Sequence, residues 1–420
     1  MIEEIQNYEV VIVGGGPAGS TAAAVLAMAG RRVLLLEKEK FPRYHIGESL
    51  LPFCYFPMQR IGMIERMKAS HFPRKHAVQF VTRDGRVSTP FYFFKHMDHE
   101  AAVTWQVFRG EFDQMMLQNA EEKGATVMQE TEVLDFLREN DKIVGVVAAS
   151  KDGRTLEVRA PMTIDASGRG ALAIKRNDWR KWDPQLDKTA LWTYHRGAKR
   201  DPGIDEGSTT VAFLPERGWF WYIPLPGDVV SVGVVAEKDY LFGASHDLPD
   251  IYRREVHKNA WIEEHLAAGR QFGDYYVTKE YSYRSEHSAM DGLVLVGDAF
   301  AFLDPVFSSG VYLAMRGGEI AADTVHQSLL DNDVSAERFT AYSEQMRREI
   351  ESMRKLVYAF YDTTFSFGKF IRARPEFHGD VTNCLIGNLD HDFQALFSAV
   401  AEFTAVPGPL DHGRPLAAVS

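Results

Sequence analysis

Three glycines near the start of the chain, Gly14, Gly16 and Gly19, are spaced as G-x-G-x-x-G between a short apolar run and an alanine-rich stretch. The first permits a tight turn, the second lets a phosphate approach the backbone, and the third lets a helix pack closely on a strand. The start of that helix offers unpaired N–H groups and a positive dipole. Glu37, 18 residues after Gly19, is placed to accept a hydrogen bond from a ribose hydroxyl. These residues predict a dinucleotide site.

The elements that must position this turn are a strand at Val10–Val13, the helix after the glycines, and a strand at Val33–Leu36. Short apolar runs bounded by turn residues are typical of strands buried in a parallel sheet. Another strand is expected at 158–164. The run at 293–296 leads to Asp298, at the carboxyl end of a strand, where α/β sheets bind their ligands. We therefore expect Asp298 to bind a ribityl hydroxyl.

Four further residues carry charge or lie at a predicted helix start. Arg109 opens a helix expected to end near Gly124, and because a cation is unfavourable at a helix start, it indicates an anionic contact such as phosphate. Ser309 and Gly310 open another helix and could bind an anion through their N–H groups. Lys75 is a lone lysine, and nothing around it in the sequence distinguishes it from a solvated side chain.

A loop at 46–49 is expected to enter a helix, with Ser49 as its N-cap. Arg43 and Glu48 beside it either contact a cofactor or are a surface arginine and a glutamate favoured by the helix dipole. Strands at 78–82 and 87–94 flank Asp84-Gly85, which is a hairpin signal.

A second, β-rich region is expected from 191 to 283. Trp219 and Trp221 alternate there, so both indoles face one side of a strand, and core packing alone would explain them. An amphipathic helix is expected at 336–367, followed by an aromatic-rich helical region, and the sequence from 407 to 420 is typical of a loose tail.

Composition limits the classes of function. The chain has 420 residues, enough for two or three domains, and a net charge of −11, which disfavours nucleic acid and anionic membranes as partners. No apolar run reaches the length of a membrane span. Cys54 and Cys384 have no metal-ligand spacing, so we expect no metal site and a cytoplasmic location.

The glycine turn with Glu37, the R-x-x-F-D sequence at 109–113 and the L-V-G-D sequence at 295–298 resemble, in this order, the FAD-dependent monooxygenases of the p-hydroxybenzoate hydroxylase type. The resemblance implies an α/β fold with a Rossmann-like FAD-binding domain, an inserted antiparallel β-sheet that binds substrate, and a helical C-terminal region. The implied ranges are 1–75, 105–185 and 285–345 for the FAD domain, 76–104 and 186–284 for the sheet, and 346–420 for the helical region.

Two motifs narrow this resemblance. W-x-W-x-I-P at 219–224 and F-x-x-P-x-x-S-x-G at 302–310 are similar to the two signatures of flavin-dependent halogenases, and Lys75 stands where that family carries its catalytic lysine. Among these halogenases, the sequence is most similar to those that act on phenols and pyrroles, whose substrates are often held on a carrier protein. Together with the patterns above, it implies cofactor contacts at Gly14, Gly16, Ala18, Gly19, Glu37, Lys38, Arg109, Asp298 and Gly310.

The activity implied is halogenation by reduced FAD and O2, with chloride or bromide converted to hypohalous acid that is guided to Lys75. The resemblance implies that Ser309 and Gly310 hold the halide and that Trp219 and Trp221 separate flavin from substrate, a small electron-rich aromatic. No second nucleotide motif is present for NAD(P)H, so a separate flavin reductase is expected as partner. The alternatives are an FAD-dependent hydroxylase, a reductase of the geranylgeranyl type, and a flavin-binding redox sensor.

Overall fold

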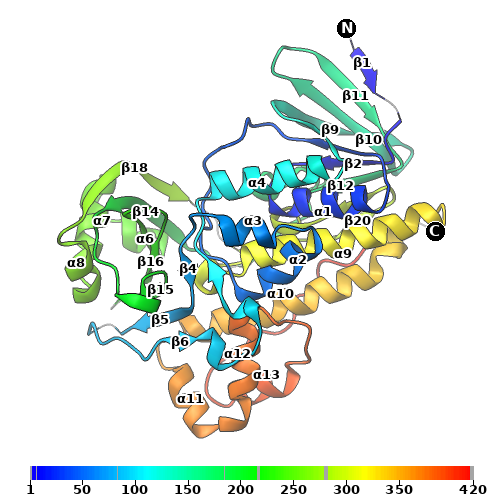
Figure 1. The fold of residues 1–420 in the computed structure, drawn as a ribbon. Helices are drawn as coiled ribbons and strands as arrows, with labels where there is room; N and C mark the ends of the chain where they lie inside the picture. Colours follow the sequence, from blue (N-terminus) through cyan, green and yellow to red (C-terminus); the bar gives the residue numbers. More distant parts are fainter. Residues whose placement is uncertain are drawn as a thin grey trace.

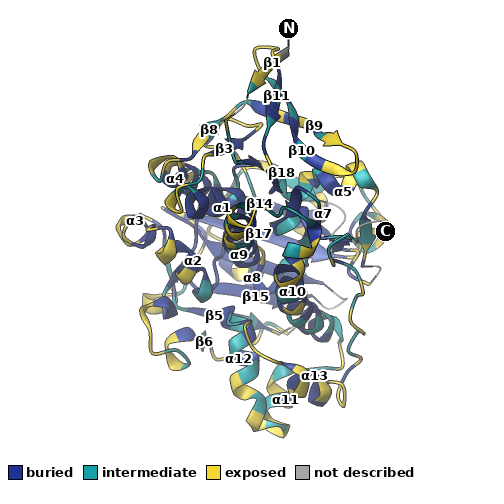
Figure 2. Cartoon of the chain, turned by 90° about the vertical axis from the view of Figure 1, so that its right-hand side faces the viewer, coloured by how far each residue is buried: buried dark blue, intermediate teal, exposed yellow. Residues whose placement is uncertain are grey.

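The fold consists of two large β-sheets and a helical region near the C-terminal end of the chain (Figure 1). The computed structural model describes residues 2–5, 7–82, 84–183, 185–214, 218–278 and 282–416. The most buried segments are the strands of both sheets and the inner faces of the long helices (Figure 2). None of the helices in these ranges combines the length and the apolar character needed to span a membrane.

The first large sheet has six strands in the order β20-β21-β12-β2-β3-β8. Strands β21, β12, β2, β3 and β8 run parallel, and β20 pairs antiparallel with β21. Its strands are β2 (Val10–Val13), β3 (Val33–Leu36), β8 (Thr126–Met128), β12 (Met162–Asp165), β20 (Ala289–Met290) and β21 (Leu293–Leu295). Every residue of β2 and β3 is buried, as is typical of strands in a parallel sheet that is covered on both faces. The two strands expected around the glycine turn are confirmed.

Helices pack on this sheet and against one another. Helix α1 (Pro17–Met28) packs between α4 (Arg109–Glu122) and α9 (Gly310–Leu330), and its alanine-rich surface allows the close approach. The shorter helices α2 (Tyr55–Arg60) and α3 (Ile64–Ala69) lie beside α9 and α4, whereas α5 (Leu172–Asn177) lies elsewhere on the molecule (Figure 2). Gly124 has a positive φ of 108° just beyond α4, as expected for a residue that ends a helix.

A four-stranded sheet lies beside the first one, in the order β1-β11-β10-β9. Its strands are β1 (Ile2–Ile5), β9 (Thr131–Glu139), β10 (Lys142–Ser150) and β11 (Thr155–Arg159). The single strand expected at 158–164 is wrong. Strand β11 ends before Pro161, which has no N–H to donate to a ladder, and β12 begins after it in the other sheet.

The second large sheet has seven strands in the order β18-β14-β17-β16-β15-β5-β6. Its pairs are antiparallel except for β5 with β15, which is parallel. Its strands are β5 (Ala77–Val81), β6 (Phe91–Tyr92), β14 (Thr189–Arg196), β15 (Thr209–Phe213), β16 (Trp219–Pro224), β17 (Val229–Ala236) and β18 (Arg270–Thr278). The hairpin around Asp84-Gly85 is present, but its second strand is shorter than expected because 93–95 form a 3-10 turn.

Three helices within the β-rich region were not expected from the sequence. They are α6 (Lys238–Phe242), α7 (Leu248–Val256) and α8 (Ala260–Leu266). Ile251 and Trp261 pack with Val232 and its neighbours on one face of the seven-stranded sheet. The opposite face carries Trp219 and Trp221, which belong to the main core cluster.

Residues 74–81 take part in two sheets. Strand β4 (Arg74–Lys75) pairs antiparallel with β7 (Thr104–Trp105), and after one residue the chain enters β5 of the seven-stranded sheet. Lys75 therefore lies at the crossover. A further small sheet joins β13 (Arg180–Trp182), β19 (Tyr283–Ser285) and β22 (Ala301–Phe302).

The C-terminal region is helical, with α10 (Thr340–Tyr361), α11 (Phe367–Ala373), α12 (His378–Ile386) and α13 (Gln394–Val400). The expected loose tail is wrong over 407–416. The N–H groups of Gly413 and Leu416 donate to backbone carbonyls at 286 and 289, and Arg347 donates from Nε to the His412 carbonyl at 2.9 Å. Residues 417–420 lie outside the described residues. The division into domains at the boundaries given above stays a prediction.

Candidate active site

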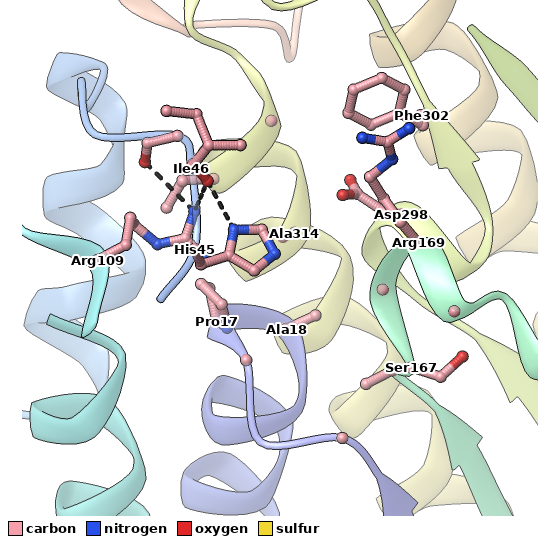
Figure 3. A pocket seen from close by; sticks show the side chains of 18 of the residues that line it. Pro17, Ala18, His45, Ile46, Arg109, Ser167, Arg169, Asp298, Phe302 and Ala314 are labelled. Carbon is pink, nitrogen blue, oxygen red and sulfur yellow. Dashed lines mark hydrogen bonds between the residues drawn. The ribbon is translucent and has the colours of Figure 1, made fainter. Parts of the chain in front are cut away.

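A cavity of about 920 Å³ lies at the carboxyl ends of the parallel strands, between the two large sheets. Figure 3 shows Arg109, His45 and Ile46 on one wall, Asp298, Arg169 and Phe302 on the other, and Pro17 and Ala18 at the start of α1 between them. Its volume and position are those of a cofactor site in an α/β fold.

The glycine turn shapes one end of the cavity. Gly14 has φ +102°, and a Cβ there would lie 2.5 Å from the Ala166 carbonyl oxygen. A Cβ on Gly19 would lie 1.9 Å from the Gly14 oxygen, so Gly19 packs behind the turn and does not line the cavity. A Cβ on Gly16 would meet only the Arg43 guanidinium, at 3.8 Å. The space in front of Gly16 is therefore open, at the helix start where phosphate is stabilised.

Glu37 directly follows β3 beside this turn, and its side chain is buried. Its Oε2 accepts from the Gly15 N–H at 2.7 Å, and its Oε1 accepts from the Glu39 N–H at 2.8 Å. These bonds fix the carboxylate where a ribose would bind, and each oxygen keeps a lone pair for it. Lys38 is exposed at the rim. The open glycine turn, the fixed carboxylate and the cavity volume together fit FAD.

Arg109 lines the cavity but is held by the protein itself. Its Nε and Nη2 donate to the two Asp113 oxygens at 2.8 and 2.9 Å, and its Nη1 donates to the Ile46 carbonyl at 2.9 Å. Arg43 donates to the same carboxylate at 2.8 Å. Burial raises the pKa of Asp113, but the Arg109 charge and hydrogen bonds outweigh it and leave that pKa below the usual value. In the structure, the anion that Arg109 contacts at the start of this helix is therefore the Asp113 carboxylate.

The opposite wall contains Asp298 and the start of α9. Removal from water raises the pKa of Asp298 to about 6, against the opposing charges of Arg169 and Arg109. Ser308, in the left-handed region at φ +57°, and Gly310 line the cavity, whereas Ser309 is buried behind them as the residue preceding α9.

Lys75 is 2% exposed and does not line the cavity. Its Nζ donates to Ser49 Oγ at 2.8 Å and to the Leu50 carbonyl at 3.0 Å, and among the described residues it has no carboxylate partner. Burial lowers the pKa of Lys75 to about 7. The expected N-cap at Ser49 is wrong, because its hydroxyl is engaged by Lys75 and by Thr209 Oγ1 at 2.8 Å. Ser49 and Thr209 line the cavity, so Lys75 lies one hydroxyl group behind its wall.

Trp219 and Trp221 both line the cavity from β16, with ring centroids 6.1 Å apart, so they share one side of the strand as expected. Trp219 Nε1 donates to the Tyr361 hydroxyl at 2.9 Å. That hydroxyl donates to Asp304 Oδ2 at 2.7 Å. The phenol at the end of α10 thus joins the W-x-W-x-I-P strand to the F-x-x-P-x-x-S-x-G turn.

Sequence reasoning left Glu48 open and missed the tyrosines around it. Glu48 is 2% exposed and lines the cavity, and its Oε1 lies 2.8 Å from the Tyr194 hydroxyl. Tyr44 stacks on Tyr276 and lies 3.0 Å from the Tyr194 hydroxyl. The alternation of aromatic residues at 192 and 194 on β14, like that of Trp219 and Trp221, was the available signal. No group of three or more metal-ligand side chains occurs within the described part of the chain.

Comparisons with known proteins show the family to which the chain belongs. The family model for tryptophan halogenases matches residues 9–103 and 84–368. The chain is 31% identical to a 1H-pyrrole-2-carbonyl-[peptidyl-carrier protein] chlorinase of Pseudomonas fluorescens, covering 91% of this chain and 90% of that protein. It is 31% identical to the corresponding brominase of Pseudoalteromonas luteoviolacea, covering 92% and 93%. The chain belongs to the flavin-dependent halogenase family.

Solved structures show the same relationship. The flavin-dependent brominase Bmp2 superposes with a TM-score of 0.85 at 29% identity, covering 95% of this chain and 98% of that one. The myxobacterial chondrochloren halogenase CndH superposes with a TM-score of 0.79 at 33% identity, covering 94% and 93%. The expected fold class is confirmed, and the family resemblance drawn from the motifs is correct.

Proposed function

We propose that this protein halogenates a small electron-rich aromatic substrate with chloride or bromide and that Lys75 guides the halogen. The observation that carries the proposal is the position of Lys75, a buried amine separated from the cofactor cavity by the Ser49 hydroxyl. The chemistry supplied by bound reduced FAD with O2 is a two-electron oxidation of the halide to hypohalous acid. The protein must then keep that oxidant away from water and direct it.

Different residues of the chain would bind different parts of the cofactor. The N–H groups at the Gly14–Gly16 turn and the start of α1 would hold the pyrophosphate, and Glu37 the ribose. Asp298 would bind a ribityl hydroxyl, and Arg109 would stay in the wall as a fixed positive charge. The halide would bind at the start of α9, where the Ser309 and Gly310 N–H groups are unpaired by the helix.

Lys75 is suited to receive hypohalous acid. A buried amine with a pKa of about 7 is present in both the charged and the neutral form near neutral pH. The ammonium polarises the acid through a hydrogen bond, and the amine attacks its halogen. Both roles require that the oxidant leaves the flavin. The tryptophans of β16 line the cavity wall and would favour this by separating the flavin from the substrate.

The substrate is proposed from the relatives. Two of them act on a pyrrole carried by a peptidyl-carrier protein, so we propose a pyrrole or phenol, presented on a carrier. Reduced FAD is proposed to come from a separate flavin reductase, because the chain has one dinucleotide motif. The protein alone should therefore leave NADH unoxidised.

The experiment compares Lys75→Ala with wild type and with Lys95→Ala, an exposed lysine 20 residues further along. Reduced, FAD-loaded protein is mixed with O2, bromide and an electron-rich phenol, and products are identified by mass spectrometry. We expect Lys75→Ala to bind FAD as wild type does, because Lys75 does not line the cavity, and to form no brominated product. Normal bromination by Lys75→Ala would refute the role of Lys75. A hydroxylated product from wild type without bromide would refute the proposed function itself.

A further inference from the structure

We propose that Ser49 is a further catalytic residue, which holds hypohalous acid at the cavity wall and transfers a proton as the halogen passes to Lys75. Thr209 and Gln106 act with it as positioning residues. This inference rests on the proposed function and deepens it, because it assigns the step between the cavity and the buried amine. Lys75 does not line the cavity, whereas Ser49 and Thr209 do.

Several elements bring these side chains together. Lys75 lies on β4, whose partner strand β7 is followed directly by Gln106. The Gln106 backbone forms an antiparallel β-bridge with Ser49. Thr209 begins β15, which pairs with β5. A Cβ on Gly207 would lie 2.1 Å from a carbonyl oxygen of β4. The turn before β15 is therefore packed directly on the strand that carries Lys75.

The hydrogen bonds around Thr209 have a fixed direction. Gln106 Nε2 donates to the Gly207 carbonyl at 2.9 Å and to Thr209 Oγ1 at 2.8 Å. A carbonyl oxygen can only accept, so the amide nitrogen must face Gly207, and Gln106 Oε1 has no partner in the described ranges that would favour the opposite orientation. Thr209 therefore accepts from Gln106, and its own proton is left for Ser49 Oγ, 2.8 Å away.

This direction leaves the Ser49 proton for the cavity. Ser49 Oγ accepts from Thr209 and from Lys75 Nζ, each at 2.8 Å, which uses both of its lone pairs. The Ser49 proton then has no acceptor in the described part of the chain. Because Ser49 lines the cavity, its hydroxyl can donate to a molecule held there. Hypohalous acid offers an oxygen that accepts this proton.

Lys75 is placed to receive the halogen from that molecule. Its Nζ donates to Ser49 Oγ at 2.8 Å and to the Leu50 carbonyl at 3.0 Å. In the amine form, these two hydrogen bonds use both N–H groups and leave the nitrogen lone pair free to attack the halogen. Burial lowers the pKa of Lys75 to about 7, so the amine form is present at neutral pH.

The transfer is one cyclic step. The Lys75 nitrogen bonds to the halogen, and the electron pair of the halogen–oxygen bond leaves with the oxygen. That oxygen takes the Ser49 proton and departs as water, while Ser49 Oγ takes the proton that Lys75 donates to it. One amine and one hypohalous acid give one haloamine and one water, with Ser49 unchanged. The aromatic substrate then takes the halogen and returns its ring proton to the Lys75 nitrogen.

The two positioning residues keep the Ser49 proton directed to the cavity. A hydroxyl group rotates freely unless its neighbours fix it. Without the Gln106 amide, Thr209 Oγ1 can accept the Ser49 proton, which then points away from the cavity. Without the Thr209 hydroxyl, Ser49 loses the donor that holds its oxygen in place.

The first experiment uses FAD-free protein. One equivalent of hypochlorous acid is added at pH 8, and the chloramine on Lys75 is located and measured by peptide mass spectrometry. We expect the share of oxidant found on Lys75 to fall about tenfold in Thr209→Val, the effect of one lost hydrogen bond. It should fall about 100-fold in Ser49→Ala, the scale of catalysis by proton transfer. Thr209→Ser keeps the hydroxyl and should retain the wild-type share.

Thr210 provides the matched control. It follows Thr209 on β15, is 2% exposed, and its Oγ1 also accepts from a glutamine amide, Gln79 Nε2 at 2.8 Å. Its side chain lies on the other side of the strand and does not line the cavity. Thr210→Val should therefore leave the chloramine on Lys75 unchanged. Thermal unfolding of each variant measures any loss of stability separately.

The second experiment uses protein loaded with reduced FAD and mixed with O2 and bromide, without substrate. Hypobromous acid that leaves the protein is trapped by a phenol attached to dextran, which is too large to enter. The bromamine that stays on the protein is then measured with iodide. We expect the sum of the two to be the same in wild type, Thr209→Val and Gln106→Leu, because these residues act after the halide is oxidised. The trapped share should rise in both variants.

The outcomes separate this inference from the proposed function. Ser49→Ala that forms as much chloramine on Lys75 as wild type overturns the role of Ser49. Equal losses in Thr209→Val and Thr210→Val, or no recovery in Thr209→Ser, overturn the positioning role. Wild type that oxidises no bromide refutes the proposed function, and the experiment with added hypochlorous acid still decides whether Ser49 serves Lys75.

Discussion

Replacing Lys75 by methionine should make the protein more stable while removing its activity. The ordinary lysine pKa is 10.5, and burial lowers the pKa of Lys75 to about 7. Below pH 7 the folded protein must hold a buried ammonium, so the full free-energy cost of burying that charge applies. Between pH 7 and 10.5 the unfolded chain binds a proton that the folded protein does not, so stability rises with pH. Above 10.5 the penalty is gone.

The magnitude follows from these two values. At ~1.4 kcal/mol for each pH unit, the lysine costs about 4 kcal/mol at pH 7 and about 2 kcal/mol at pH 9. Methionine removes this cost but leaves the Leu50 carbonyl without its donor, a loss of about 2 kcal/mol. Lys75→Met should therefore gain about 2 kcal/mol over wild type at pH 7 and about nothing at pH 9.

The assay is thermal unfolding of FAD-free protein at both pH values and one scan rate. With an unfolding entropy of ~2.1 cal/mol/K per residue, 2 kcal/mol in this chain corresponds to a Tm about 2 °C higher. Lys142→Met, at the exposed first residue of β10, is the control and should show no such pH-dependent gain. A Lys75→Met protein with a lower Tm than wild type at pH 7 would refute the reasoning. A Tm difference of the same size at both pH values would refute it as well.

Three further predictions concern the glycine turn and the Tyr361 phenol at the end of α10. Gly14→Ala should destabilise the FAD-free protein by at least about 2 kcal/mol, because its φ is +102° and the Cβ would meet a carbonyl oxygen at 2.5 Å. Gly16→Ala should leave the Tm of FAD-free protein unchanged and raise the FAD dissociation constant about tenfold or more, measured by flavin fluorescence; equal effects on Tm would contradict this. Tyr361→Phe should lower stability by about 1 kcal/mol and increase the hypohalous acid escaping per substrate halogenated, because Trp219 and Asp304 lose their shared hydroxyl. An unchanged ratio of escaped acid to product would show that this hydroxyl does not position Trp219.

The parts of the site that the sequence predicted are those set by short-range chemistry. The glycine turn and the strands beside it depend on neighbouring residues, and a turn that needs φ of +102° selects glycine whatever surrounds it. The position of Glu37 could be predicted because it directly follows a strand, whose direction fixes where the next residue lies. The same logic placed Asp298 just beyond the end of β21.

The parts that were wrong or missed depend on distant contacts. Ser49 looked like an N-cap because helix starts favour serine, but its hydroxyl bonds to Lys75, 26 residues away. Glu48 and Tyr194 are separated by 146 residues and meet only because the loop that holds Tyr44 and Glu48 lies against β14 of the second large sheet. The tail from 407 to 416 has a loop-like composition, yet buried Arg347 and a neighbouring strand hold it.

The crossover at residues 74–81 has a consequence for exchanging modules between relatives. A chimera joined at the predicted boundary between 75 and 76 would take the Lys75 amine from one parent and β5, the strand that begins two residues later, from the other. The position of the Lys75 amine in the chimera would then depend on a sheet that comes from the other parent. A junction placed before Pro73, with a matching one after Trp105, transfers β4, its partner β7 and β5 as one piece. Recombination libraries with junctions before Pro73 and after Trp105 should retain the geometry around the amine far more often than libraries with a junction between 75 and 76.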